Sequence, residues 1–426
     1  MEKIMQLLDA GSFMELGGQV CARSTDLCSA SGAKASDGVV TGYGTVGGKL
    51  VYLFAQDSSV MGGTFGEMHG EKIIRLYRQA MRAKAPVIGL LDCRGIRIEE
   101  GIDGLETFSK LYRVQAEASG NIPQLMAVIG RCGGGMSIAA RMADFVFVEK
   151  EKGELFLQGD PDIQEAYAEG SLSWEEITEN IRSLIELLPC SVDEMPPAGP
   201  CSDDLNRMCP ELDSFDGDGR ELLTVISDDR FFLETGAEHG TGMTTGFFKL
   251  NGAAVGGVAA CGKLTADGLD KAADFISLCD TYHIPVLTVT DTEGFASGEK
   301  EEIFLPKAAG RMVRALTCAS VPKVNLIVGQ IYGSAYSMMN TRGLGADYVF
   351  MWETAHVNVL HTHQALDMLD QKLEPSKLQL MSEVYEKNRS SADAMARRGY
   401  ADKRIKPSET RQYLAGAFET FANLYR

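Results

Sequence analysis

The chain has 426 residues, of which 45% are hydrophobic and 23% charged, so it is long enough for two ordinary globular domains. A net charge of −18 argues against a nucleic-acid binder, which would present a basic face. No apolar stretch reaches the roughly 20 residues of a membrane span. The ten scattered cysteines form no Cys-x-x-Cys pair, and the N-terminus lacks the apolar centre of a signal peptide, so we expect a cytoplasmic protein without a zinc ribbon.

Short apolar runs that open on a proline predict buried parallel strands, and they occur at matching places in the two halves of the chain. Ala85–Asp92 and Ile122–Gly130 recur as Ile284–Asp291 and Val321–Gly329, each 199 positions later. An upstream pair, 40–44 and 244–248, matches at an offset of 204. Several landmarks in nearly constant register indicate an internal duplication.

Helical patterns alternate with these strands. Asp103–Ala118 is predicted to be a helix that buries one face, made by Leu105, Phe108, Leu111 and Tyr112. Further strands end at Val148 and Met351, so each half reads as strand–helix–strand. The pattern predicts an α/β fold in two tandem domains, 1–199 and 200–426, which meet in the Pro/Gly cluster 195–200. The Gly-x-Gly-x-x-Gly of a dinucleotide-binding unit and a Walker loop are both lacking.

A turn of small residues follows the second proline-led strand of each half, at Cys132–Met136 and at Tyr332–Tyr336. Such a turn before a helix leaves backbone N–H groups without partners, and small side chains let a ligand oxygen reach them. This arrangement is typical of an oxyanion hole. A tight turn with close helix packing explains one glycine cluster equally well, but small residues at the same place in both halves favour a donor site.

The sequence contains few patterns of acid–base or metal-binding residues. The chain has six histidines and lacks a Gly-x-Ser-x-Gly elbow. His361 and His363 would point to the same side of a strand, which is a weak metal pattern, so we expect no metal. Two oxyanion holes would reduce the need for a strong side-chain base.

These features resemble the carboxyltransferase subunits of biotin-dependent acyl-CoA carboxylases and decarboxylases. The resemblance spans roughly residues 36 to 420. It is carried by the segments 37–45, 54–57, 62–69, 85–89, 97–101, 244–247, 284–285, 294–295, 321–324, 398–400 and 407–411.

The resemblance implies two crotonase-like ββα-superhelix domains and a dimer of trimers, as a homo- or hetero-hexamer. The acyl-CoA would lie along the N-terminal domain, and biotin would enter from the C-terminal domain. Because this sequence has no biotinyl-lysine segment, biotin must sit on a separate carrier protein. A biotin carboxylase or membrane decarboxylase subunits are the further partners that the resemblance implies.

Site residues carried over by motif fall into two groups. Gly134 and Gly135 would hold the thioester enolate oxygen, and Ser334 and Ala335 the ureido oxygen of biotin. The acyl-CoA side would further use Gly62, Gly63, Gly95, Arg97 and Ser337, the last at the position that tunes acyl length. The biotin side would use Gly294, Phe295 and Gly333. Arg94 and Arg131 are further candidates for CoA phosphates, since guanidinium groups suit that task.

Departures from the family pattern concentrate in the C-terminal half. Ser334 stands where the pattern has glycine, Glu293 stands where it has proline, and Leu360–Gln364 replaces a glycine-rich segment. Two alternatives to a biotin-dependent carboxyltransferase therefore stay open. In the first, the chain is a non-catalytic or specialised partner subunit. In the second, it is a biotin-independent crotonase-type enzyme. The latter needs a carboxylate over the α-carbon, for which Glu99, Glu100 and Asp103 are the candidates; their ordinary role is a solvated helix start.

Overall fold

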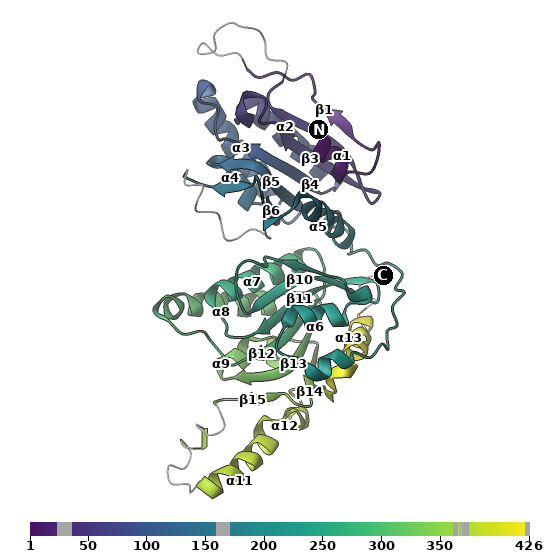
Figure 1. Ribbon diagram of the computed structural model, residues 1–426, viewed down its shortest axis with the longest axis vertical. Helices are drawn as coiled ribbons and strands as arrows, with labels where there is room; N and C mark the ends of the chain where they lie inside the picture. The colour runs from purple at the N-terminus through teal and green to yellow at the C-terminus, as the bar shows by residue number, and fades with distance from the viewer. Residues whose placement is uncertain (24–35, 159–170, 361–364, 367, 369–374, 422–426) are drawn as a thin grey trace. The chain divides into compact units, whose positions relative to one another are not determined.

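The computed structural model describes residues 1–23, 36–158, 171–360, 365, 366, 368 and 375–421. The chain divides into two compact units, Met1–Met195 and Pro196–Arg426, and the division falls inside the Pro/Gly cluster (Figure 1). Each unit combines one sheet with helices, so the predicted α/β fold is confirmed. Across the described residues, every helix is too short or too polar to cross a membrane.

The first unit is built on an eight-stranded sheet of order β1-β2-β3-β4-β5-β6-β8, with β7 paired to β5. The strands are β1 (Met14–Leu16), β2 (Val39–Val46), β3 (Lys49–Gln56), β4 (Val87–Cys93), β5 (Gln124–Gly133), β6 (Phe145–Glu149), β7 (Glu154–Phe156) and β8 (Ser171–Leu172). The helices are α1 (Glu2–Leu7), α2 (Glu67–Ala83), α3 (Ile102–Ala118), α4 (Gly135–Arg141) and α5 (Trp174–Leu187). Strands β1 to β3 are antiparallel, and the remaining pairs are parallel.

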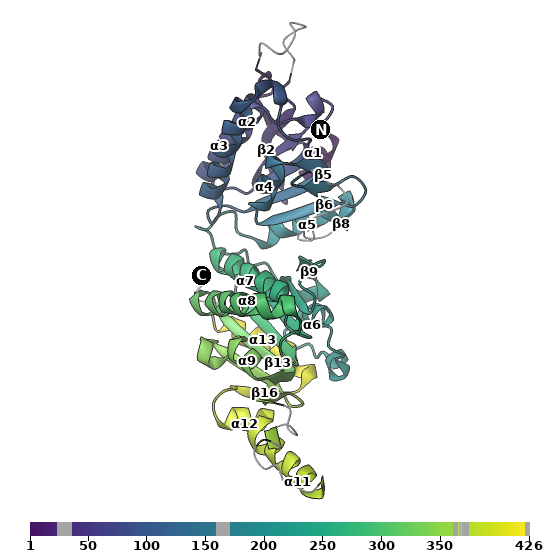
Figure 2. The same cartoon turned by 90° about the vertical axis from the view of Figure 1, so that its left-hand side faces the viewer.

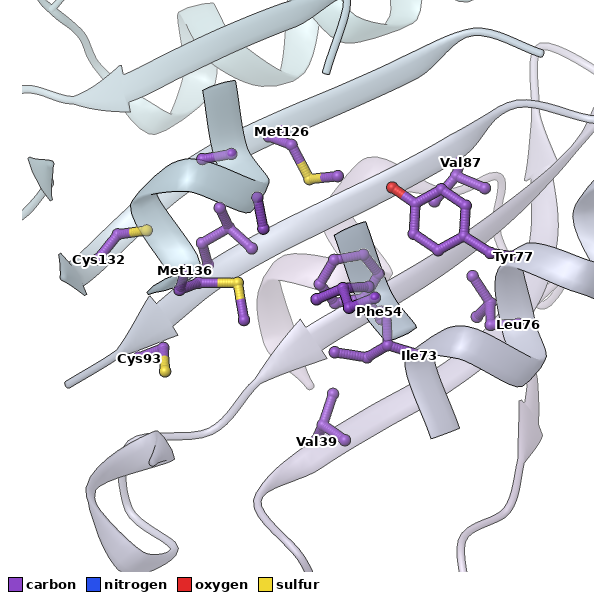
Figure 3. Close-up of a cluster of buried hydrophobic side chains, with 14 of the residues drawn as sticks. Val39, Phe54, Ile73, Leu76, Tyr77, Val87, Cys93, Met126, Cys132 and Met136 are labelled. Carbon is purple, nitrogen blue, oxygen red and sulfur yellow. The ribbon is translucent and has the colours of Figure 1, made fainter. Parts of the chain in front are cut away.

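The core of this unit lies between the sheet and α2, α3 and α4 (Figure 2). Phe108 of α3 stacks on Phe65 with ring centroids 3.8 Å apart. The predicted helix is confirmed, but its buried face is not quite the predicted one, because Leu105 is 57% exposed. Figure 3 shows Met136 of α4 among the buried side chains with Cys93 and Cys132, so the turn before α4 is anchored in the core.

The second unit has the same plan, with a sheet of order β16-β14-β13-β12-β11-β10-β9 and β15 paired to β13. The strands are β9 (Phe232–Thr235), β10 (Met243–Leu250), β11 (Ala253–Cys261), β12 (Val286–Thr292), β13 (Lys323–Tyr332), β14 (Tyr348–Trp352), β15 (His356–Asn358) and β16 (Lys403–Ile405). The helices are α6 (Gly219–Ile226), α7 (Ala266–Thr281), α8 (Glu299–Cys318), α9 (Ser334–Met338), α11 (Pro375–Tyr385), α12 (Ala392–Arg397) and α13 (Thr410–Glu419). Figure 1 shows α7 and α8 side by side, with α6 and α13 on the other side of the sheet.

The two units align strand for strand, as the repeat predicts. Strands β10 and β11 lie 204 positions after β2 and β3, whereas β12 and β13 lie 199 positions after β4 and β5. The offset changes by five because the connection from β3 to α2 has ten residues and that from β11 to α7 has four, while β11 is one residue longer than β3. This longer connection, which ends at Gly66, contains a 3-10 turn at Met61–Gly63.

An aspartate at the end of a central strand fixes each turn that follows the neighbouring strand. Asp92 Oδ1 accepts a hydrogen bond from the Arg131 N–H at 3.2 Å, and Asp291 Oδ1 accepts one from the Gln330 N–H at 2.9 Å. Both aspartates lie at register shifts in their strand pairs. The glycine before each donor is required for packing, since a Cβ on Gly329 would lie 2.1 Å from the Asp291 carboxylate.

We predict that Gly329→Ala destabilises the protein by about 1–3 kcal/mol, because the added methyl group must displace the Asp291 carboxylate. Gly310→Ala is the matched control: Gly310 lies inside α8 with open space around its Cα, so alanine there should stabilise by roughly 0.5–1 kcal/mol. Urea unfolding at one protein concentration measures both values. Equal stabilities for the two variants would contradict this packing account.

Candidate active site

The two small-residue turns have nearly the same backbone conformation. Gly134 precedes α4 with φ 59° and ψ −133°, and Gly333 precedes α9 with φ 57° and ψ −135°. A residue with a side chain rarely adopts this φ, so both positions require glycine. The helices that follow have seven and five residues, so their dipoles add little and the individual N–H groups carry the site.

Each glycine of the first triplet has its own structural reason. A Cβ on Gly133 would lie 2.6 Å from the Phe156 ring, and one on Gly135 would lie 2.8 Å from the Tyr112 hydroxyl oxygen. That hydroxyl donates a hydrogen bond to the Gly135 carbonyl oxygen at 2.8 Å. The packing interpretation of the triplet is therefore correct for its outer members, whereas the central glycine is required by its conformation.

The amides that remain available differ by one position between the halves. The Gly333 N–H donates to the Asn358 carbonyl oxygen at 2.8 Å, whereas within the described residues the Gly134 N–H has no backbone acceptor. The next two amides after Gly333, those of Ser334 and Ala335, likewise have none there. The structure thus offers donor pairs at Gly134 and Gly135 and at Ser334 and Ala335, the residues that the sequence suggested.

A chain of hydrogen bonds connects the first turn to the interior of its unit. The Asp92 N–H donates to Gln56 Oε1 at 3.1 Å, and Gln56 Nε2 lies 3.2 Å from His69 Nε2. His69 Nδ1 lies 3.1 Å from the Asp37 carbonyl oxygen, which can only accept. His69 must therefore carry its proton on Nδ1 and accept from Gln56 on Nε2.

His69 is a structural histidine. It is fully buried, and this burial lowers its pKa to about 3, with smaller contributions from Arg97 and Lys72. The ring therefore stays neutral at physiological pH and links Gln56 to the Asp37 backbone.

Arg97 is placed differently from the sequence expectation. Its side chain is almost completely buried and forms an ion pair with Glu100 at 2.8 Å. It also donates to the Asp37 and Thr64 carbonyl oxygens and to the Thr64 hydroxyl. A guanidinium with these partners cannot reach a CoA phosphate without leaving them, so Arg97 positions the loop at Thr64. Glu100 likewise is not the solvated residue we expected.

The remaining N-terminal candidates surround the end of β4. A Cβ on Gly63 would lie 2.1 Å from the Asp92 carbonyl oxygen, so Gly63 packs on this strand end. Gly62 lies beside Arg94, and the Gly95 carbonyl oxygen accepts from the Phe65 N–H at 2.8 Å. Gly62, Gly63 and Gly95 are therefore brought together next to the aspartate that fixes the Gly134 turn.

Four of the C-terminal candidates line one cleft of about 280 Å³, whereas Ala335 is fully buried and is not part of its lining. Gly294 and Phe295 come from the loop after β12, and Gly333 and Ser334 from the second turn. Val359 and Leu360, both exposed, supply apolar walls. Ser337 is exposed in α9 and does not line this cleft.

The other candidates do not form a second chemical site. Glu99 and Asp103 are exposed, and Glu100 is used in its ion pair. In the part of the chain that the structure describes, three or more metal-ligating side chains never come together. His361 and His363 lie outside the described residues. Gln56 and His69 lie in the segments 54–57 and 62–69 that carry the resemblance, but the sequence assigns them no role. Their role depends on contacts between distant segments.

Comparison with known proteins now identifies the family. The model of the carboxyl transferase domain matches residues 1–176 and 172–424. This chain belongs to the carboxyl transferase family. The propionyl-CoA carboxylase beta chain of Roseobacter denitrificans is 34% identical and is aligned over 99% of this chain and 90% of its own length. The methylmalonyl-CoA decarboxylase subunit alpha of Propionigenium modestum is 33% identical over 98% of this chain and 89% of its own.

A solved structure extends the comparison to the fold of this carboxyltransferase. Transcarboxylase 12S, described as a hexamer with methylmalonyl-CoA and methylmalonic acid bound, matches with a TM-score of 0.90 and 28% identity. The match covers 99% of this chain and 89% of the 12S chain. The resemblance stated from the sequence is thereby confirmed, as is the tandem crotonase-like fold.

We predict that His69 makes the folded state sensitive to mild acid. Between pH 6.5 and 3 the unfolded chain protonates this histidine and the folded chain does not, so stability falls as pH falls, by about 1.4 kcal/mol per pH unit. In His69→Gln, the free energy of unfolding should depend less steeply on pH, by this contribution, when urea unfolding is followed from pH 6.5 to 4.5. His283→Asn, at a partly exposed histidine with positive φ, is the control and should keep the wild-type slope. An unchanged slope in His69→Gln would refute the assignment.

Proposed function

We propose that this carboxyltransferase moves a carboxyl group between N-carboxybiotin, carried on a separate protein, and the α-carbon of a short acyl-CoA. The observation that carries this proposal is the pair of equivalent turns, each with two backbone amides directed to a ligand oxygen. The relatives include a propionyl-CoA carboxylase beta chain and a methylmalonyl-CoA decarboxylase subunit, which supports an acyl-CoA substrate.

The N-terminal unit takes the acyl-CoA. When the α-carbon gains or loses a carboxyl group, the thioester passes through an enolate whose oxygen is negatively charged. The amides of Gly134 and Gly135 hold that oxygen, and such preorganised donors act without a side-chain base. Gly62, Gly63 and Gly95 let the chain approach the substrate closely, while Arg97 fixes their loop. Ser337 keeps the role that the resemblance implies for it, at the position that tunes acyl length.

The C-terminal unit takes biotin. The amides of Ser334 and Ala335 donate hydrogen bonds to its ureido oxygen, and Gly294, Phe295 and Gly333 line the ring. A cleft of about 280 Å³ with apolar walls, which Ser334 lines and the fully buried Ala335 follows in the chain, fits a small cyclic urea joined to a hydrophobic ring. When bound, biotin supplies a nitrogen that carries the carboxyl group. The protein contributes orientation and proximity.

The active protein is a hexamer arranged as a dimer of trimers, in the cytoplasm. Transcarboxylase 12S, a structural neighbour, is described as a hexamer. A biotin carrier protein, with a biotin carboxylase or membrane decarboxylase subunits, completes the system.

The purified full-length protein should release carboxylate from malonyl-, methylmalonyl- or glutaconyl-CoA, and biotin or a biotinylated carrier should stimulate the release. Chromatography of the CoA products measures the reaction. If none of these thioesters loses its carboxyl group with biotin and a carrier present, the proposal fails and the role of a non-catalytic partner subunit takes its place.

Ser334→Pro tests the second donor pair with little other change. Proline at the first position of α9 removes one N–H and adds no new Cβ. We expect biotin-stimulated turnover to fall by about 10²–10³-fold, as when one oxyanion donor is removed. Binding of the acyl-CoA to the first unit should not change.

Ser334→Ala is the matched control, because it keeps the N–H and removes only the hydroxyl group. It should retain activity within a few-fold of the wild type. Equal losses in the two variants would mean that the serine hydroxyl, and not the amide, acts at this position.

A further inference from the structure

Glu293 brings a carboxylate into the cleft beside the Ser334 turn. Within the lining that the structure describes it is the sole carboxylate, and its neighbours there are Gly294, Tyr332 and Ser334. The side chain is exposed and forms neither a hydrogen bond nor an ion pair with another described residue. Its charge is therefore directed at the cleft.

The fold does not require an acid at this position. Glu293 corresponds through the duplication to Arg94, which has the opposite charge. The residues around both keep their structural roles, since Gly95 and Gly294 each accept a backbone N–H, from Phe65 and Leu264, at 2.8 and 2.9 Å. We conclude that the charge at this position follows the ligand of each unit and not the packing of the loop.

Electrostatics agree with a carboxylate close to the turn. Burial raises the pKa of the Tyr332 hydroxyl, and the negative charges of Glu293 and Glu386 raise it further. Tyr332 donates its hydroxyl proton to Gln330 Oε1 at 2.6 Å and so has no proton to offer to Glu293. The carboxylate of Glu293 keeps its capacity to accept a hydrogen bond from a ligand.

The cleft therefore offers donors and an acceptor to the same small ligand. Ser334 lines the cleft, and Ala335, the next residue, is fully buried; we assign both amides to a ligand oxygen and the Glu293 carboxylate to an N–H group. Phe295, which is 38% exposed, and the side chains of Val359 and Leu360 provide apolar surface against which a ligand can pack. A cyclic urea fused to a hydrophobic ring carries all three features, with its C=O and N–H groups on adjacent atoms.

We propose that the Glu293 carboxylate accepts a hydrogen bond from the ureido N–H of biotin at N3′, the nitrogen that does not carry the carboxyl group. This inference rests on the proposed function and adds a positioning residue to it. With the oxygen held by two amides and N3′ held by Glu293, the ring has one orientation. The transferring nitrogen, N1′, is then left free to face the acyl-CoA.

A comparison of two ligands on the full-length protein tests the assignment. Biotin and biotin methylated at N3′ are titrated calorimetrically against the wild type and Glu293→Ala. A hydrogen bond to a charged acceptor is worth roughly 10- to 100-fold in binding, so the wild type should prefer biotin by at least about tenfold. Glu293→Ala should lower this preference to less than about twofold, because it removes the acceptor and leaves room for the methyl group.

Glu386→Ala is the matched control. It removes the other acid that influences Tyr332 but does not line the cleft. This variant should keep the wild-type preference and the wild-type KM for acyl-CoA. A preference that persists in Glu293→Ala, or that is lost equally in Glu386→Ala, overturns the role of Glu293 alone. Failure of the wild type to bind biotin overturns the proposed biotin site, and the inference with it.

Discussion

The carboxylate at the end of each central strand controls the position of the small-residue turn that follows the neighbouring strand. Asp92 and Asp291 each hold the first exposed N–H of the neighbouring strand. Both lie where the strand register shifts, which re-aims the chain as bulges do next to active sites. The glycine that follows each strand then takes a positive φ, and the next amides point away from the sheet. The donor pairs exist because this sequence of constraints is met twice.

Duplication gave the two units the same arrangement of strands and turns, and they differ in the residues around the turns. The first unit has a longer loop, which contains Met61–Gly63, and a triplet of glycines at its turn. The second unit uses the Gly333 N–H for β15, which shifts its free amides forward by one residue. The residues at the equivalent positions Arg94 and Glu293 also carry opposite charges. The same arrangement of strand and turn could thus bind the oxygens of two different ligands.

The repeat made much of this predictable from the sequence. Constant register predicted the strands, and small residues at matching places predicted two turns that share one backbone conformation. The buried role of Arg97 could not be predicted, because its partners at Asp37 and Thr64 are distant in sequence and are brought together only by folding. The prediction that Leu105 is buried is wrong for a related reason. Helical periodicity predicts a buried stripe, but packing against α2 determines which residues at the border of that stripe are buried.

The free amides of Gly134 and Gly135 are the centre of this account, and a complex with an acyl-CoA tests them most directly. A crystal structure of the protein with a non-hydrolysable acyl-CoA should place the acyl carbonyl oxygen about 3 Å from both amide nitrogens. A carbonyl oxygen bound by side chains elsewhere, with both amides left to solvent, would contradict the account.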